Sequence, residues 1–309
     1  MGRLIVGRGG ALVGVIWLLG ALGLWWSAAG VIAAGHPAYA VALGGTGLLG
    51  AGLLAWAVAR GRRTVRSVRR RGRVLRGIAA GVVTALVLGA LVWLRPFAAA
   101  PEAVAAMRGA DGVALADTAT RITLTPARAP RAGLVFQPGA RVDPRAYVPL
   151  LTRVAASGFL VVIVKQPLGI GFLATGESAA VRRDHPEVTR WAVGGHSLGG
   201  VVSAADAGRP DVAGLVLWAS YPASWLADRS GLAVMSISGS QDGLSTPATI
   251  QAARTLLPST TTYVVVDGAV HAYFGDYGPQ PGDGTPTVAR EPAQARIVEA
   301  TVVLLDAIS

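Results

Sequence analysis

The chain has 309 residues, of which 52% are hydrophobic and only 15% are charged. Soluble proteins usually have about a quarter of charged residues, so this composition indicates that part of the chain lies in a membrane. The net charge of +11 comes from the first hundred residues. Residues 1–100 contain twelve arginines and no acidic residue, whereas residues 101–309 are close to neutral. A nucleic-acid-binding function for the second part therefore has no support, and we expect no nucleic-acid partner.

The sequence contains no cysteine. Disulfide bonds, zinc sites with cysteine ligands and cysteine nucleophiles are therefore excluded. No cluster of Asp and His residues suggests a metal site, and we expect neither a metal nor an organic cofactor. Arginine outnumbers lysine by 27 to 1, which is typical of a GC-rich bacterial genome.

Three uncharged apolar segments occupy residues 11–34, 38–59 and 77–94. Each falls within the range of lengths that cross the hydrocarbon core of a bilayer as a helix. The first segment could instead be a signal peptide, but its apolar run is too long and it has no clear small-residue cleavage site. We therefore predict a membrane region over residues 1–100 with three transmembrane helices, and we expect the lipid bilayer to be a partner.

The arginines predict the orientation of this region. Nine of them lie in the loop 60–76, between the second and third apolar segments, and Arg3 and Arg8 precede the first segment. Loops rich in arginine remain on the cytoplasmic side, so the third helix would carry the rest of the chain across the membrane. The loop could also bind nucleic acid or a calmodulin-like partner, but beside two membrane segments it is more typical of a topogenic signal. We expect a multi-pass protein of the cell membrane whose second domain lies outside the cytoplasm.

The pattern after residue 100 predicts an α/β domain over residues 101–309, preceded by a short Pro-bounded linker. A short helix and a β-hairpin come first, and apolar β-branched runs then alternate with helical segments. This alternation indicates a mostly parallel sheet covered by helices on both faces. The expected hairpin strands are 111–118 and 121–126, the later strands are 133–139, 159–167, 191–197, 212–220, 232–240 and 261–268, and the helices are 101–108, 144–157, 198–207, 247–256 and 292–307.

The segment GHSLG at residues 195–199 fits the pattern G-x-S-x-G. In this pattern a serine sits on a sharp turn between a strand and a helix, where it is presented as a nucleophile. Because the chain contains 41 glycines, a Gly-rich turn with an ordinary serine is a real alternative. A serine hydroxyl also needs a base, usually histidine, a carboxylate that orients this base, and N–H donors for the oxyanion. The rest of the sequence must supply these partners to Ser197.

Chain order selects the acid and the base. The acid and then the histidine follow the serine of such a strand-to-helix turn, which is called a nucleophile elbow. His271 is the one histidine that follows the last apolar strand, although it could be an exposed loop histidine. Asp242 directly follows a predicted strand, although Asp-Gly is also good turn chemistry. Asp267 and Asp276 compete with Asp242, but both lie close to His271 in the sequence. We therefore expect Asp242 as the acid and His271 as the base.

Two backbone N–H groups are candidates for the oxyanion hole. One is that of Leu198, the residue after the nucleophile, and the other comes from the loop after the strand 133–139. Pro138 has no N–H, so Gly139, Ala140 and Arg141 are the available donors, of which we expect Ala140.

Four segments together resemble the α/β-hydrolase superfamily. They are FQPGARVDPRAYVPLLTRVAASGFLVVIV, WAVGGHSLGG, SGSQDGL and VHAYFGDYGPQPGDG. More narrowly, they resemble the small lidless bacterial hydrolases related to dienelactone hydrolases and carboxylesterases, over roughly residues 110–309. The resemblance implies an α/β-hydrolase fold with Ser197 as nucleophile, Asp242 as acid, His271 as base, and Ala140 and Leu198 as oxyanion donors. Many relatives carry His-Gly in the oxyanion loop, where this chain has Pro138 and Gly139. The short connections after the elbow leave no room for a large cap.

These features predict a membrane-anchored serine hydrolase that cleaves carboxylic esters through an acyl-enzyme. Its substrate would be a small-molecule or lipid-derived ester. The same triad could serve an acyltransferase, which passes the acyl group to a sugar or lipid hydroxyl rather than to water. The domain could also be a catalytically silent binding domain on a membrane anchor, since a fold alone implies no chemistry.

Overall fold

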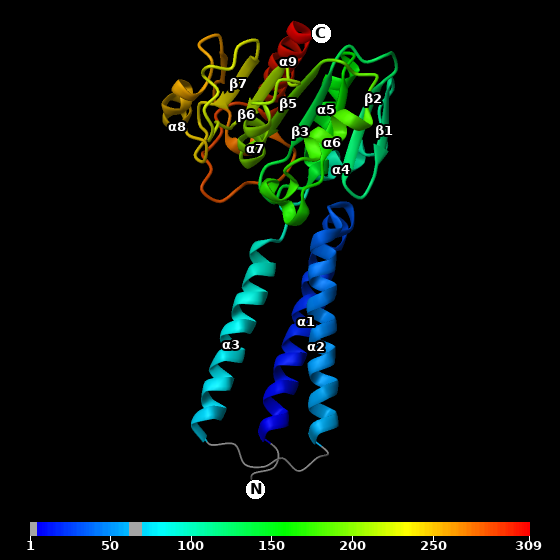
Figure 1. The fold of residues 1–309 in the computed structure, drawn as a ribbon, viewed down its shortest axis with the longest axis vertical. Helices are drawn as coiled ribbons and strands as arrows, with labels where there is room; N and C mark the ends of the chain where they lie inside the picture. The colour runs from blue at the N-terminus through cyan, green and yellow to red at the C-terminus, as the bar shows by residue number, and fades with distance from the viewer. Residues whose placement is uncertain (1–4, 62–69) are drawn as a thin grey trace. The chain divides into compact units, whose positions relative to one another are not determined.

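The computed structural model describes residues 5–61 and 70–309, and the chain divides into two compact units (Figure 1). The first unit, Met1–Ala33 with Pro37–Arg95, contains the N-terminal helices. The second unit is Pro96–Ser309 together with Ala34–His36. The two units have different architectures, and each is described by itself.

The helices of the first unit are α1 (Ile5–Ala34), α2 (Pro37–Gly61) and α3 (Arg70–Trp93). Among the described residues, these three helices each contain a stretch long and apolar enough to cross a membrane. Large apolar side chains such as Leu19 and Leu48 are exposed on their surfaces, which suits contact with lipid tails. The prediction of three apolar helices is confirmed.

Two of these helices extend further than the sequence analysis predicted. The loop was expected at residues 60–76, but α2 continues to Gly61 and α3 begins at Arg70. Arginine is a good helix former, so a helix can continue past the end of its apolar stretch. Residues 62–69 of the expected loop, and Arg3, lie outside the described residues. The orientation inferred from these arginines therefore stays a prediction.

Helices α1 and α2 approach each other closely at Gly14 and Gly50. A Cβ atom added to Gly50 would lie 2.8 Å from the carbonyl oxygen of Gly14 and 3.0 Å from the Cβ of Trp17. Small residues let the backbones of membrane helices come this close. Helix α3 also contacts α1, since the indole N–H of Trp17 donates to the hydroxyl of Thr84 at 3.0 Å and a Cβ at Gly20 would lie 3.0 Å from the side chain of Leu88.

We predict that Gly50→Ala lowers the stability of the full-length protein in detergent by about 1–3 kcal/mol, because the added methyl group overpacks the α1–α2 contact. The matched control is Gly52→Ala, on the same helix, where an added Cβ meets nothing within 4 Å. This control should be neutral or slightly stabilising, because alanine has a higher helix propensity than glycine. Thermal unfolding of both variants measures the difference, and equal midpoints would contradict the close contact.

In the described part of the second unit, eight strands form one sheet in the order β1-β2-β4-β3-β5-β6-β7-β8. β1 and β2 form an antiparallel hairpin, β2 pairs antiparallel with β4, and all other neighbours are parallel. This confirms the expected mostly parallel sheet. The strands are β1 (Val113–Asp117), β2 (Arg121–Pro126), β3 (Gly133–Gln137), β4 (Leu160–Val164), β5 (Trp191–His196), β6 (Gly214–Trp218), β7 (Ala233–Gly239) and β8 (Thr262–Val266).

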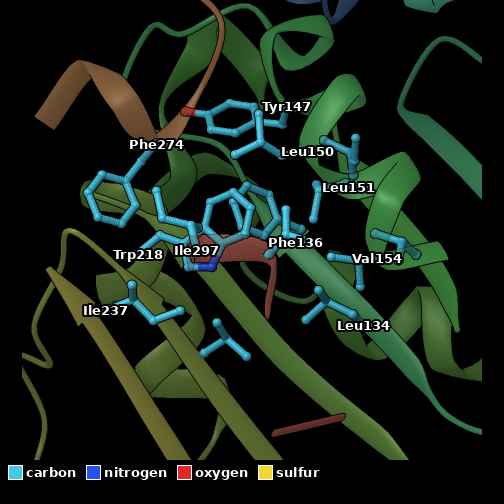
Figure 2. Packing of buried hydrophobic residues seen from close by; sticks show 14 of the residues in the cluster. Leu134, Phe136, Tyr147, Leu150, Leu151, Val154, Trp218, Ile237, Phe274 and Ile297 are labelled. Carbon is cyan, nitrogen blue, oxygen red and sulfur yellow. The ribbon is translucent and has the colours of Figure 1, made fainter. Parts of the chain in front are cut away.

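Helices cover both faces of this sheet, because consecutive strand residues point to opposite faces and both sets are apolar. Alternate residues of β3 illustrate this, since Leu134 and Phe136 pack with α5 and α9, whereas Val135 packs on the side of α6. Figure 2 shows the first of these cores, in which Phe136 of β3 packs against Trp218 of β6, and Leu151 of α5 lies on the other side of Phe136. The helices are α4 (Pro101–Ala106), α5 (Val148–Ala156), α6 (Glu177–Asp184), α7 (Leu198–Asp206), α8 (Pro247–Ala252) and α9 (Arg290–Ile308), and the 3₁₀ turns are η1 (Pro144–Tyr147), η2 (Pro167–Gly169), η3 (Gly171–Ala174), η4 (Ala253–Leu256) and η5 (His271–Phe274).

Candidate active site

The three expected triad residues lie at the same edge of the sheet. Ser197 follows β5, Asp242 follows β7, and His271 follows β8 as the first residue of η5. The carboxyl ends of parallel strands meet at one edge, where ligands bind in open α/β sheets. The topology therefore gathers residues that are far apart in the sequence.

Ser197 occupies a strained turn between β5 and α7. Its backbone has φ 52° and ψ −125°, a conformation that costs a non-glycine residue about 1–3 kcal/mol. The turn is held from both sides, since Ser197 N–H donates to the carbonyl of Trp218 at 3.0 Å and its carbonyl accepts from the hydroxyl of Ser220 at 2.7 Å. A Cβ at Gly199 would clash with the carbonyl oxygen of Gln137, so the sharp turn requires glycine there. These features are those of a nucleophile elbow.

This strain gives a stability prediction for two variants that lack the Ser197 hydroxyl. We expect Ser197→Gly to be about 1 kcal/mol more stable than Ser197→Ala, because glycine adopts a positive φ at little cost while alanine keeps the strain. The entropy that glycine adds to the unfolded chain offsets only part of this gain. Chemical or thermal unfolding of the two full-length variants in one detergent measures the difference. A Ser197→Ala variant of equal or higher stability would show that the turn is relaxed.

Asp242 and His271 form a buried hydrogen-bonded pair. The Nδ1 of His271 lies 2.8 Å from Oδ2 of Asp242, and both side chains are fully buried. The other oxygen, Oδ1, accepts the backbone N–H groups of Leu244 at 2.8 Å and Ser245 at 2.7 Å. The carboxylate thus both stabilises the turn after β7 and hydrogen-bonds His271, and its role as the acid stays a prediction.

The competing carboxylates do not contact His271 in the described structure. Asp276 accepts a hydrogen bond from the side-chain amide of Gln294 at 2.8 Å, and Asp267 is exposed. The Nε2 atom of His271 is buried and has no hydrogen-bond partner among the described residues. Ser197 is half-buried and its hydroxyl makes no hydrogen bond to this nitrogen in the described structure. Such contacts are often loose in enzymes without substrate, and a free Nε2 can accept a proton.

His196, inside the elbow, is a second buried histidine beside this pair. Its ring lies 4.4 Å from that of His271, centroid to centroid, and its Nδ1 is 2.9 Å from the hydroxyl of Tyr147. Burial lowers the pKa of His196 well below its ordinary value, and the nearby His271 adds to this effect. Burial also raises the pKa of Tyr147. The Tyr147 hydroxyl therefore stays protonated and His196 stays neutral, and the two side chains share one buried hydrogen bond.

Tyr147 also shapes the loop after β3. Its hydroxyl accepts the N–H of Gly139 at 2.9 Å, and the N–H of Arg141 donates to the carbonyl of Gly169 at 2.7 Å. Of the donors that the sequence offered in this loop, Ala140 is thus the one whose N–H has no partner among the described residues. The N–H of Leu198, at the first position of α7, is unpaired in the same way. Both groups thus remain the candidate donors for an anionic oxygen.

The segment after α3 supports this loop. Residues 96–100 were expected to be a simple linker, but Phe97 donates its N–H to the carbonyl of Arg141 at 2.6 Å and accepts from the N–H of Asp143 at 3.0 Å. The Asp143 carboxylate in turn pairs with Arg145 at 2.7 Å and accepts the N–H of Ala99. Backbone groups of this segment need partners, and the loop provides them.

Two contributors to the site were not predicted from the sequence. Tyr147 reaches His196 across 49 residues of sequence, and Asp283 accepts backbone N–H groups of both His271 and Gly243. Neither contact has a local sequence signal. An Asp between two glycines, as at Asp283, indicates only a turn. No group of three or more His, Asp or Glu side chains that could hold a metal ion occurs within residues 5–61 and 70–309.

A strand order with an antiparallel hairpin at one edge, and a serine elbow after the central β5, defines the α/β-hydrolase class of proteins. A family model described as "Alpha/beta hydrolase family" matches residues 133–295, which is more than half of the chain. The chain therefore belongs to the alpha/beta hydrolase family, and the resemblance to that superfamily is confirmed. The matched region contains Ser197, Asp242 and His271. A search of curated proteins finds no match, and the narrower likeness to dienelactone hydrolases and carboxylesterases stays a prediction.

Proposed function

We propose that this chain is a membrane-anchored serine hydrolase that cleaves carboxylic esters. The observation that carries the proposal is the buried pair of Asp242 and His271, whose unpaired Nε2 belongs to the same sheet edge as the strained Ser197. A serine activated by a histidine, with a carboxylate that orients the histidine, is the arrangement that acyl transfer requires.

In the proposed reaction, the hydroxyl oxygen of Ser197 attacks the carbonyl carbon of the ester while Nε2 of His271 takes its proton. Asp242 stabilises the imidazolium through the Nδ1–H bond. When the tetrahedral intermediate collapses, the C–O bond to the alcohol breaks and His271 returns the proton to this leaving group. Water, deprotonated by His271, then attacks the carbonyl carbon of the acyl-enzyme. The bond between this carbon and the Ser197 oxygen breaks, and His271 returns the proton to that oxygen, which releases the carboxylic acid and restores the serine hydroxyl.

The negative oxygen of each tetrahedral intermediate would be bound by the backbone N–H groups of Ala140 and Leu198. Both groups are unpaired in the described structure and follow strands that are direct neighbours, β3 and β5. Donors that are already oriented stabilise developing charge without reorganisation, and losing one typically costs about 100- to 1,000-fold in rate. The bond from Gly139 to Tyr147 supports this assignment, because it holds the loop in place.

We predict that a fluorophosphonate probe labels the full-length protein in isolated membranes. Ser197→Ala should remove the labelling completely, because the nucleophile is absent, and His271→Ala should slow it strongly, because no base takes the proton. Asp242→Asn should slow labelling by roughly 1,000- to 10,000-fold, since it favours the wrong histidine tautomer. In-gel fluorescence over time measures these rates.

The matched control is His185→Ala, which removes a half-exposed histidine that bonds Glu187 at the surface. It should label like the wild type. A folded wild type that does not react, or labelling unchanged in Ser197→Ala, would contradict the triad and favour a binding domain. Product analysis in the presence of an alcohol distinguishes hydrolysis from acyl transfer, because an acyltransferase would form a new ester.

We also propose that the hydrolase domain lies outside the cytoplasm and acts on small or lipid-derived esters there. The arginine-rich segment between α2 and α3 supports this orientation. Because the chain has no cysteine, single cysteines report their own side of the membrane without background. We expect a membrane-impermeant maleimide to label exposed Thr285→Cys in intact cells, and Ser67→Cys only after permeabilisation. The reverse pattern would place the catalytic domain in the cytoplasm.

A further inference from the structure

The Asp283 carboxylate is surrounded by backbone N–H groups. In the described structure, its Oδ1 accepts from His271 at 3.1 Å, from Gly243 at 3.3 Å and from Gly284 at 2.7 Å. Its Oδ2 accepts from Ala272 at 2.8 Å. Hydrogen bonds to an ionised carboxylate are roughly twice as strong as neutral ones. One side chain thus collects four donors from three separate stretches of backbone.

These stretches are the ones that carry the proposed acid and base. Gly243 directly follows Asp242, and His271 and Ala272 begin η5. The Asp283 carboxylate therefore bridges the loop after β7 and the loop after β8. It does so through backbone N–H groups, next to the residues whose side chains form the Asp242–His271 pair. The pair itself supplies a second bridge between the same two loops. With both bridges in place, the two loops are linked through backbone and through side chains.

Backbone packing between the loops shows that the bridge is built into the fold. A Cβ at Gly243 would lie 2.6 Å from the carbonyl oxygen of Gly282, and one at Gly284 would clash with that of Gln241. Residues 282–284 thus lie directly against residues 241–243. This close approach requires glycine at positions 243 and 284, and it brings the carboxylate within reach of all its donors. Gly282 has a φ of 87°, which favours glycine for a different reason.

We propose that Asp283 is a positioning residue that holds the imidazole of His271 in line between Asp242 and Ser197. This inference rests on the proposed function. Asp283 acts through the His271 and Ala272 backbone and touches no reacting atom. Without its carboxylate, the N–H groups of His271 and Gly243 lose their acceptor, and the histidine backbone can shift relative to the elbow. A misplacement of about 1 Å can cost roughly 100-fold in rate.

The test compares Asp283→Ala and Asp283→Asn with the wild type, using the full-length protein in detergent. The measurements are kcat and KM with p-nitrophenyl butyrate, the rate of fluorophosphonate labelling, and the midpoint of thermal unfolding. We expect Asp283→Ala to lower kcat and the labelling rate by about 10- to 100-fold, with KM changed less than about twofold. Asp283→Asn should fall in between, because its amide oxygen still accepts from part of the donor set.

The matched control is Asp276→Ala, in the same segment between η5 and α9. Its buried carboxylate bonds Gln294 rather than the His271 backbone. This variant should lower the unfolding midpoint while kcat of the folded protein stays within about twofold of wild type. A difference in kcat between the two alanine variants separates positioning from general destabilisation.

The outcomes for this inference and for the proposed function are distinct. A folded wild-type protein that neither reacts with the fluorophosphonate nor hydrolyses p-nitrophenyl butyrate would contradict the proposed function. A wild type that labels, together with Asp283→Ala or Asp283→Asn variants that fold and react at the wild-type rate, would overturn the role of Asp283 alone. A change in KM without a loss of kcat in Asp283→Ala would also overturn it, and so would an equal loss of kcat in Asp276→Ala. If Asp283→Ala does not fold, the Asp283→Asn variant decides by the same criteria.

Discussion

The buried hydrogen bond between Asp242 and His271 is the interaction on which the site depends. Both side chains are fully buried, at a distance of 2.8 Å. A buried carboxylate is costly unless it is paired and hydrogen-bonded, and Asp242 meets this requirement with His271 and with two backbone N–H groups. Removing one partner of such a pair leaves an uncompensated buried group. The loops after β7 and β8 are therefore joined at this pair, and the Nε2 of His271 has no hydrogen-bond partner among the described residues.

The rest of the site is built around this pair by the order of the strands. β3 and β5 are neighbours in the sheet, and the chain at the end of β3 lies against the elbow, since a Cβ at Gly199 would clash with the carbonyl oxygens of Gln137 and Pro138. The Tyr147 hydroxyl joins the loop after β3 to His196, the residue that immediately precedes Ser197. The strained backbone of Ser197 is held by hydrogen bonds with Trp218 and Ser220, and the Trp218 side chain is buried in the core (Figure 2). Packing, strain and polar contacts thus support one arrangement.

Local patterns in the sequence predicted much of the second unit. Apolar β-branched runs marked the strands, and G-x-S-x-G with its chain order pointed to Ser197, Asp242 and His271. Helix α6 was missed because its residues are mostly polar and have no apolar period. The contacts of Tyr147 and Asp283 were missed for another reason, since each joins segments that only the folded topology brings together. Tertiary hydrogen bonds of this kind leave no period or spacing in the sequence.

The most direct measurement of the central claim is the mass of the covalent intermediate. The full-length protein is mixed with p-nitrophenyl acetate, quenched within the first turnover, digested and analysed by mass spectrometry, while p-nitrophenol release is followed. The account predicts a burst of about one equivalent of p-nitrophenol and an acetyl group on Ser197. A folded protein that releases p-nitrophenol without acylation of Ser197, or with the acetyl group on another residue, would contradict it.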